Sequence, residues 1–588
     1  MCGLFFKISE SPDREFERYV TQLLFHRGPD DQGAYFEQVG DRYLSFIHTR
    51  LSILDVSMMG HQPFRYKDTL LIFNGEIYNY IELREELRQD GYTFETGTDT
   101  EVITAMYDKY SVECFAKFLG MWAIILYDAV AKEVVISRDR FGVKPLYYAE
   151  NDGDLIMSSE IKPVKHFLKR PALNRDVVSD FLREGVLDNN ADTFFDGICR
   201  FPPASYARIS LNKKSMAVSP NVTTYYRVES AIDNRQVSVA ELEAVLKDAV
   251  DKHLRSDVPL GFCLSGGLDS STLLKLSVSS GQIANAMAFN GYSNYPGCDE
   301  RANIELLAKT TKFQINYVSP SDAEIAADLM DIFNTQEEPF LSTSVILQWY
   351  VFKMIGRHGV KVVLDGQGSD EIFAGYPTFY LQSLLDNFRR AQYVKLASVL
   401  WRILRYYSHL VRDGLYNYRP MPRVEPLGFP ADQLKHTLIY YIKHRSLPAL
   451  LRYEDKNSMR FSVESRVPYL DHRLVDLALS CDSSLLINGG RTKSILREAM
   501  GNSLPRAIID EKRKIGFAAP EEKWVQGLVE GNRKEFLAGI HKLREEGLGH
   551  ETLLEKLHAQ IQERSRVRET SRLWRYYCIV KWRKAFKV

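Results

Sequence analysis

The sequence has no long hydrophobic run, no net charge and no paired cysteine motif. No stretch approaches the ~18 uncharged apolar residues of a membrane-spanning helix, so we expect no transmembrane segment. The 76 basic and 76 acidic side chains cancel, which gives no indication of nucleic-acid binding. The seven cysteines are scattered without a CxxC pair, so neither a disulfide framework nor a structural zinc site is expected.

A secretion signal, internal repeats and low-complexity tracts are also missing. The segment SPDREFERYV (11–20) is charged where a signal peptide would need an apolar core. We therefore expect a protein of the reducing cytoplasm. A chain of 588 residues is too long for one core and predicts roughly two to four domains.

The period of the hydrophobic pattern divides the chain in two. Residues 2–210 contain short strand-like runs separated by tight turns, which is typical of antiparallel sheets, with a few helical segments between them. The strand-like runs are TLLIF (69–73), MWAIILYD (121–128), KEVVISRD (132–139), PLYYAE (145–150) and DLIMSSE (154–160). The polar residues 211–236 are interpreted as a linker.

Residues 237–588 form the second predicted domain. Strands such as VPLGFCL (258–264) and KVVLDG (361–366) alternate with helices, which predicts a doubly wound parallel sheet with ligands at the strand C-termini. From about residue 376 the pattern is mostly helical. The fold class is therefore α/β with two domains, the second carrying a largely helical C-terminal part.

The motif SGGLDS (265–270) lies between a buried strand and a helix. Its glycines allow the backbone to approach an anion, and the helix start presents free N–H groups, so the loop is suited to bind phosphate. It is not a Walker A loop, because no GK[ST] follows. An ordinary Gly-Gly turn before a helix is the alternative.

A second loop, DGQGSDE (365–371), follows another predicted strand and is rich in carboxylates. One strand-end loop with N–H donors and one with carboxylates are together suited to Mg²⁺-bound triphosphate. The pair is a stronger indication than either loop alone.

These loops resemble those of a known enzyme group. SGGLDS resembles the pyrophosphate-binding loop of the ATP pyrophosphatases, which activate a carboxylate or carbonyl as an adenylate. DGQGSDE, the segment LRYEDKNSMRFSVESRVPYLDHRLVDLAL (451–479) and GRTKSILREAM (490–500) resemble the asparagine synthetase branch of that group. The resemblance covers nearly the whole chain.

The resemblance implies ATP and Mg²⁺ as cofactors and assigns roles to residues of the second domain. Asp269 and Asp370 would hold Mg²⁺, and Lys493 would reach the phosphates, although a solvated surface lysine is the ordinary alternative. The residues expected to bind ATP and pyrophosphate are Leu264, Ser265, Gly266, Gly267, Asp269, Ser270, Phe289, Asp365 and Gly366.

An amide-forming synthetase needs ammonia, and the first domain contains motifs that suggest its source. MCGLFF at the start, HRGPDDQG (26–33), HTRLSILD (48–55), FNGEIYN (73–79) and GTDTE (97–101) resemble, in this order, the class II glutamine amidotransferase domain. The resemblance implies the four-layer αββα fold of the N-terminal-nucleophile hydrolases, with two antiparallel sheets between helical layers.

The resemblance also implies a glutaminase mechanism. Once Met1 is removed, the Cys2 thiol would attack the glutamine amide and its own α-amine would act as the base. Asn74 and the N–H of Gly75 would form the oxyanion hole. Arg50 would bind the α-carboxylate of glutamine, and Glu76 and Asp99 its α-ammonium. Taken singly, Arg50 could be a surface ion pair and the Asn-Gly pair a plain turn.

Gln367 departs from the family pattern. The better-known asparagine synthetases read SGEGSDE in this loop, and their Glu is thought to be a base or charge partner during adenylate capture. Glutamine cannot take a proton, so another residue is the base, ammonia arrives neutral, or the substrate differs. Asp365, where those enzymes have Ser, partly restores the charge.

A long insertion follows this loop, between about residues 376 and 450. Its apolar, arginine-containing stretch VLWRILRYYSHLVRDGLYNYRPMPR (399–423) is interpreted as a helix packed in the core, with a dock for a large anionic or membrane-associated acceptor as the alternative. For SRLWRYYCIVKWRKAFKV (571–588) we likewise predict a packed terminal helix.

The leading hypothesis is glutamine-dependent, ATP-driven amidation, with ammonia passing through an internal channel to β-aspartyl-AMP. The first alternative keeps this mechanism and changes the acceptor to a sugar uronate, a cell-envelope carboxylate or a secondary-metabolite acid. A catalytically dead scaffold and a plain N-terminal hydrolase are further alternatives. The partners are then small molecules, namely glutamine, ATP and a carboxylate acceptor. The sequence does not give the oligomeric state, although dimers are common among these enzymes.

Overall fold

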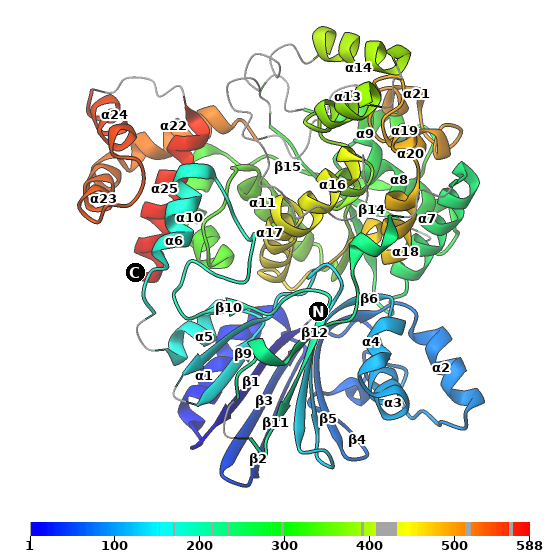
Figure 1. The fold of residues 1–588 in the computed structure, drawn as a ribbon, viewed down its shortest axis with the longest axis vertical. Helices are drawn as coiled ribbons and strands as arrows, with labels where there is room; N and C mark the ends of the chain where they lie inside the picture. Colours follow the sequence, from blue (N-terminus) through cyan, green and yellow to red (C-terminus); the bar gives the residue numbers. More distant parts are fainter. Residues whose placement is uncertain are drawn as a thin grey trace.

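The computed structural model gives the arrangement of most of the chain. It describes residues 2–588 except 152, 169–170, 214–215, 233–235, 284, 294, 296–298, 390–392, 407–431, 512–518 and 564–568. The two antiparallel sheets lie in one part of the molecule, and the parallel sheet with its many helices lies in the other (Figure 1).

Two six-stranded antiparallel sheets form the first part of the chain. The first sheet has the order β10-β8-β9-β1-β3-β2, with β1 (Gly3–Ser9), β2 (Asp31–Val39), β3 (Arg42–Arg50), β8 (Tyr147–Asn151), β9 (Asp154–Ser158) and β10 (Cys199–Arg200). The second has the order β12-β11-β7-β6-β5-β4, with β4 (Phe64–Tyr66), β5 (Thr69–Ile77), β6 (Gly120–Asp128), β7 (Glu133–Arg138), β11 (Ser205–Ser210) and β12 (Val222–Thr224). The five predicted strand runs are confirmed as β5 to β9.

Helices cover the outer face of each sheet, and an apolar core lies between the two sheets. Phe6 and Ile72 point between the sheets and share one apolar core, because side chains alternate across a strand. Their neighbours Phe5 and Leu71 face outward. The first sheet is covered by α1 (Arg14–Leu24) and α5 (Ile161–Phe167), and the second by α2 (Tyr80–Gln89), α3 (Asp99–Tyr110) and α4 (Cys114–Lys117). The four-layer αββα architecture is thus confirmed.

Part of the segment predicted to be a linker packs with this first domain. Met216 and Val218 are buried in the core between the sheets. β12 lies within the same segment and pairs with β11. The second sheet therefore continues to Thr224.

The second part contains a five-stranded parallel sheet of order β15-β14-β13-β16-β17. The strands are β13 (Leu260–Cys263), β14 (Met287–Gly291), β15 (Gln314–Val318), β16 (Val362–Leu364) and β17 (Glu464–Arg466). The chain runs outward from β13 to β15 and returns on the other side as β16. Ligands of doubly wound sheets bind at such a reversal, here at the C-terminal ends of β13 and β16. Both predicted loops leave from these two ends.

Helices surround the parallel sheet and make up most of the remaining chain. The crossover helices are α8 (Leu268–Ser279), α9 (Arg301–Ala308), α10 (Asp322–Gln336) and α11 (Ser344–Arg357). The other helices are α6 (Arg175–Glu184), α7 (Val239–His253), α12 (Ser369–Ile372), α13 (Phe379–Arg389), α14 (Tyr393–Tyr406), α16 (Gln433–Tyr440), α17 (Leu447–Met459), α18 (His472–Ser480), α19 (Ser483–Leu486), α20 (Ser494–Ala499), α21 (Arg506–Ile509), α22 (Glu521–Gly531), α23 (Arg533–Glu545), α24 (Glu551–Gln562) and α25 (Thr570–Phe586). In the part of the chain that is described, no helix is long and apolar enough to cross a membrane.

The two aromatic, basic stretches differ in how far their side chains are buried. α25 is a packed terminal helix, as predicted, with Trp574 and Trp582 fully buried. In α14 only Val399 is buried among the described apolar side chains, whereas Trp401 and Leu404 are more than half exposed. The prediction of core packing is therefore wrong for this helix, because one face alone meets α13. Residues 407–423 of the stretch lie outside the described residues.

Candidate active sites

Cys2 is buried and lies immediately before β1, the strand between β3 and β9 in the first sheet. Burial raises the pKa of its thiol, while the Leu51 N–H and the positive charge of Arg50 oppose the rise. The Cys2 carbonyl accepts a hydrogen bond from Arg27 Nε at 3.1 Å. A thiol with a raised pKa needs a nearby base before it can attack a carbonyl carbon.

Asn74, on β5, contacts Cys2 directly. Its Oδ1 accepts a hydrogen bond from the Cys2 backbone nitrogen at 2.9 Å. Its Nδ2 is buried and has no hydrogen-bond partner among the described residues. Gly75 follows, and a Cβ there would lie 2.0 Å from the Met121 carbonyl oxygen, so the close strand pairing requires glycine. An uncommitted amide donor beside the thiol has the properties of an oxyanion-hole group.

Two carboxyl groups of the first domain, Glu76 in β5 and Asp99 at the start of α3, are buried and have raised pKa values although Arg466 opposes the rise. Burial, Glu464 and Asp99 raise the pKa of Glu76 well above its usual range. Burial raises the pKa of Asp99 to about 6, although the Ile77 N–H donates to its Oδ2 at 2.9 Å. Buried carboxyls with raised pKa values favour a cationic ligand, and an α-ammonium would satisfy them.

Arg50, the residue expected to bind the α-carboxylate of glutamine, lies at the end of β3. Its guanidinium donates to the carbonyl oxygens of Ser57 at 2.7 Å and Leu54 at 3.2 Å. The side chain is 5% exposed and lowers the pKa of Cys2, so its charge is felt at the thiol. Its contact with a substrate carboxylate stays a prediction.

The SGGLDS loop connects β13 to α8. The Ser270 hydroxyl accepts the Ser265 N–H at 3.2 Å and lies 3.1 Å from the Ser265 hydroxyl. The Ser265 hydroxyl in turn accepts the Gly267 N–H at 3.2 Å. The loop thus curls around its own hydroxyl groups ahead of the α8 N-terminus, where an anion is favoured.

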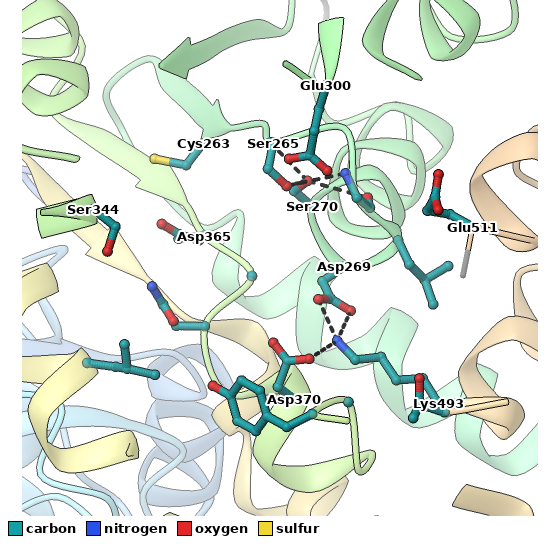
Figure 2. A pocket seen from close by; sticks show the side chains of 18 of the residues that line it. Cys263, Ser265, Asp269, Ser270, Glu300, Ser344, Asp365, Asp370, Lys493 and Glu511 are labelled. Carbon is teal, nitrogen blue, oxygen red and sulfur yellow. Dashed lines mark hydrogen bonds and ion pairs between the residues drawn. The ribbon is translucent and has the colours of Figure 1, made fainter. Parts of the chain in front are cut away.

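Lys493 connects the two predicted loops. Its Nζ lies 2.6 Å from Asp269 Oδ2 and 2.7 Å from Asp370 Oδ1 (Figure 2). The side chain is 5% exposed, and burial lowers its pKa against the opposing effect of Asp269. Ser369 donates a further hydrogen bond to Asp269 at 2.8 Å. The interpretation of Lys493 as a solvated surface lysine is therefore wrong.

Both loops line one pocket of about 320 Å³ (Figure 2). Its lining includes the predicted residues Ser265, Gly267, Asp269, Ser270, Asp365, Gly366, Asp370 and Lys493, together with Gln367. Leu264 and Phe289 do not line it, since both are fully buried within the parallel sheet, and Cys263 occupies the wall instead. Leu264, Phe289 and Gly266 are not among the lining residues, and their roles in ATP binding stay predictions.

The carboxylates suit a divalent cation. Asp269 and Asp370 both reach the same ammonium group, so their oxygens can approach one small cation, and carboxylate oxygens are the donors that Mg²⁺ prefers. A Cβ at Gly375 would lie 1.9 Å from Asp370 Oδ1, so the backbone comes close to this carboxylate. Gly375 carries no motif of its own and was not predicted from the sequence.

The cysteine site and the pocket are joined by contacts between the two domains. Arg27 forms a bidentate ion pair with Asp455 of α17, at 2.9 and 3.1 Å, and both side chains are buried. Leu51, next to Cys2, shares a small apolar cluster with Val362 of β16. The strand whose end carries Asp365 is thus packed against the loop that contacts the thiol.

Two family models match the chain, one in each part. The asparagine synthase family matches residues 241–583, and the glutamine amidotransferase domain family matches residues 1–226. "Asparagine synthetase [glutamine-hydrolyzing] 1" of Bacillus subtilis is 29% identical over 92% of each chain. "Amidase chyE" of Penicillium rubens is 27% identical over 88% of this chain and 87% of its own.

A structural relative is more distant. Glutamine phosphoribosylpyrophosphate amidotransferase from B. subtilis is 14% identical, with a TM-score of 0.27, over 62% of this chain and 81% of its own. The fold assignment above therefore depends on the strand pairing alone. The family matches identify a glutamine-dependent amidotransferase, a ligase with glutamine as nitrogen donor, and the chain belongs to the asparagine synthase family.

Proposed function

We propose that this enzyme hydrolyses glutamine at Cys2 and uses the ammonia to amidate an acyl-adenylate formed in the pocket between the β13 and β16 loops. The convergence of Lys493, Asp269 and Asp370 in that pocket is the observation that carries the proposal. A buried ammonium and two carboxylates at the switch point of a parallel sheet suit a nucleoside triphosphate.

In the glutaminase half, the Cys2 thiol attacks the side-chain carbonyl carbon of glutamine. The Cys2 α-amine takes the thiol proton and gives it to the leaving nitrogen, so that ammonia departs and a γ-glutamyl thioester remains on Cys2. Water then attacks the thioester carbonyl carbon, which releases glutamate and restores the thiol. Asn74 Nδ2 and the Gly75 N–H donate to the developing oxyanion. Glu76 and Asp99 hold the α-ammonium of glutamine, and Arg50 its α-carboxylate.

This scheme requires that Met1 be absent from the active enzyme. With Met1 attached, the nitrogen of Cys2 is an amide and cannot act as a base. Intact-mass analysis of active protein tests this requirement, and we expect the mass of a chain that begins at Cys2. An active enzyme that retains Met1 would exclude the α-amine as base.

In the synthetase half, the carboxylate of the acceptor attacks the α-phosphate of ATP and pyrophosphate leaves. The N–H groups and hydroxyls of Ser265, Gly267 and Ser270 bind the phosphates, and Lys493 stabilises the charge that develops on them. Asp269 and Asp370 would hold Mg²⁺, which would neutralise part of the phosphate charge. Ammonia then displaces AMP.

The apolar contact of Leu51 with Val362 supports transfer of ammonia within the protein. Loose ammonia in neutral water would be mostly protonated and could not attack a carbonyl carbon. A path along apolar side chains between the sites keeps it neutral.

Aspartate is the default acceptor, with asparagine as the product. The alternative is another carboxylic acid, favoured by Gln367 and by relatives that carry the name amidase. An assay of AMP release with glutamine and a panel of carboxylates separates the two. We expect asparagine from aspartate. If aspartate yields none while a uronate, cell-envelope or secondary-metabolite acid turns over, aspartate is the wrong acceptor.

A further inference from the structure

Two carboxyl groups lie beside Gln367 and have no role in the scheme above. Asp365, at the C-terminal end of β16, is 6% exposed and lines the pocket. Glu454, on α17, is 3% exposed and lies behind it. The two carboxyl groups are close enough to shift each other's pKa, and Gln367 lowers the pKa of Glu454. The Oδ2 atom of Asp365 is buried and has no hydrogen-bond partner among the described residues. They form a contiguous group on the pocket wall.

Glu454 is held in one orientation by the helices and strand around it. Ser465 Oγ, on β17, donates to its Oε1 at 2.6 Å, and Gln348 Nε2, on α11, donates to its Oε2. The orientation of Gln348 is set in turn by Asn457, whose Nδ2 donates to Gln348 Oε1 at 2.9 Å. Three elements therefore position this carboxyl group.

Asp365 has a different set of neighbours. The Gly366 N–H and the Cys263 thiol lie near it and oppose the rise that burial causes in its pKa. Burial raises the pKa of the Cys263 thiol well above its usual range, so the thiol stays protonated. The charged and titratable groups that face Asp365 are Cys263 from β13, Asp269 from α8 and Glu454 from α17. Its backbone nitrogen donates to the Arg466 carbonyl oxygen at 2.9 Å, which fixes it against β17.

Two carboxyls in contact do not both ionise in a buried site. Burial and Asp365 raise the pKa of Glu454 well above its usual range, so ionisation of Glu454 is disfavoured beside Asp365. Burial raises the pKa of Asp365 as well, against the donors around it. A carboxylate with a raised pKa is a better proton acceptor at neutral pH than an ordinary one.

We propose that Asp365 is the base that removes a proton from the attacking ammonia, and that Glu454 positions Asp365 for this step. The inference depends on the proposed function. The nitrogen lone pair forms a bond to the adenylate carbonyl carbon, and one N–H proton passes to an Asp365 carboxylate oxygen. The C–O bond to AMP then breaks, and its electron pair leaves with the phosphate. Gln367 cannot accept this proton, whereas Asp365 lines the same wall.

The test separates adenylation from amide formation. Acceptor-dependent exchange between ATP and pyrophosphate, without ammonia, measures adenylation. Amide formation is measured with ammonium in place of glutamine. Asp365→Asn should reduce amide formation about 100- to 1,000-fold, the contribution typical of a general base, and should reduce exchange, which reports the expected contact of Asp365 with ATP, far less. Asp331→Asn, which changes a partly exposed aspartate paired with Arg460, is the matched control and should leave both rates unchanged.

Glu454 is tested through the pH profile of amide formation. In wild type the rate, divided by the concentration of free ammonia at each pH, should fall at acid pH as Asp365 becomes protonated. Glu454→Leu removes a neighbour that lowers the pKa of Asp365 and should move this fall to higher pH, whereas Glu454→Gln keeps a polar group there and should leave it nearly unchanged. Glutamine hydrolysis at Cys2 and the thermal unfolding midpoint report whether each variant is folded.

Three outcomes overturn the inference. Amide formation by Asp365→Asn at the wild-type rate would exclude Asp365 as the base. Equal losses of exchange and amide formation would make it a binding residue. If the pH dependence of amide formation is the same in wild type and in both Glu454 variants, Glu454 does not position Asp365. Wild-type enzyme that shows no exchange with any carboxylate would contradict the proposed function itself.

Discussion

Arg466 Nη2 lies 3.6 Å from Glu76 Oε1, which links the edge strand of the parallel sheet to the glutamine site. Arg466 is fully buried, and its Nε donates to Glu464 Oε1 at 2.6 Å. The same residue accepts the backbone N–H of Asp365 through its carbonyl oxygen. One three-residue strand, β17, therefore contacts residues of both active sites.

Removing this guanidinium should destabilise the domain contact. Arg466→Met leaves the buried Glu464 and Glu76 without their cation, so we expect the free energy of unfolding to fall by about 3–5 kcal/mol. Denaturation in urea measures the change. The control Arg544→Met breaks the exposed pair with Glu555 and should cost less than about 1 kcal/mol. Equal effects of the two substitutions would contradict the importance of the buried pair.

Glutamine binding should depend on pH through Asp99, whose pKa is about 6 in the empty site. The α-ammonium of glutamine stabilises the ionised carboxylate, so binding expels a proton and the KM for glutamine should rise as pH falls below 6. With one proton coupled, the rise approaches about tenfold per pH unit.

The stability of the empty enzyme depends on pH in the other direction. Because the pKa of Asp99 is higher in the folded than in the unfolded state, its contribution lowers the free energy of unfolding as pH rises from about 4 to about 6.

Initial rates of glutamine hydrolysis between pH 5 and 8 measure the pH dependence of the KM for glutamine. Asp99→Asn should raise KM at neutral pH and remove most of its change with pH. A KM that is constant across this range in wild type would indicate that Asp99 does not contact the ammonium group.

Asn74→Asp should disable the oxyanion hole while keeping the acceptor for the Cys2 nitrogen. The substitution replaces the uncommitted Nδ2 donor by oxygen, so kcat for glutamine hydrolysis should fall about 100- to 1,000-fold. Ammonium-dependent amide formation in the same variant is the internal control and should stay at the wild-type level. Unchanged glutamine hydrolysis would exclude Asn74 from the oxyanion hole.

Lys493→Met should stop the synthetase half and spare the glutaminase half. The substitution removes a buried side-chain cation that contacts both Asp269 and Asp370. AMP formation should fall about 100-fold or more, because a phosphate-stabilising charge is lost. Lys275→Met is a suitable control, since Lys275 lies on α8 but outside the pocket lining. A parallel loss of glutamine hydrolysis would instead indicate misfolding of Lys493→Met.

The two loops of the pocket were predictable because each is a continuous motif directly after a buried strand. Glu454, Gln348 and Arg466 were not, since their roles depend on α11, α17 and β17 packing together across more than a hundred residues of sequence. β17 has only three residues, which is too short for the alternation of apolar and polar residues that identifies a strand. The apolar pattern of α14 led to a wrong prediction of core packing. Periodicity shows that a helix has an apolar face, but it does not show whether another element covers that face.

The central claim is that ammonia released at Cys2 reacts with the adenylate before it reaches solvent. Its most direct test uses glutamine labelled with ¹⁵N in the side-chain amide, ATP, the acceptor acid and excess unlabelled ammonium, with mass spectrometry of the amide product. The proposed function predicts a product that carries mostly ¹⁵N, with one AMP formed per amide, and no labelled product from Cys2→Ala. A product whose nitrogen matches the isotope ratio of the solution would contradict internal transfer.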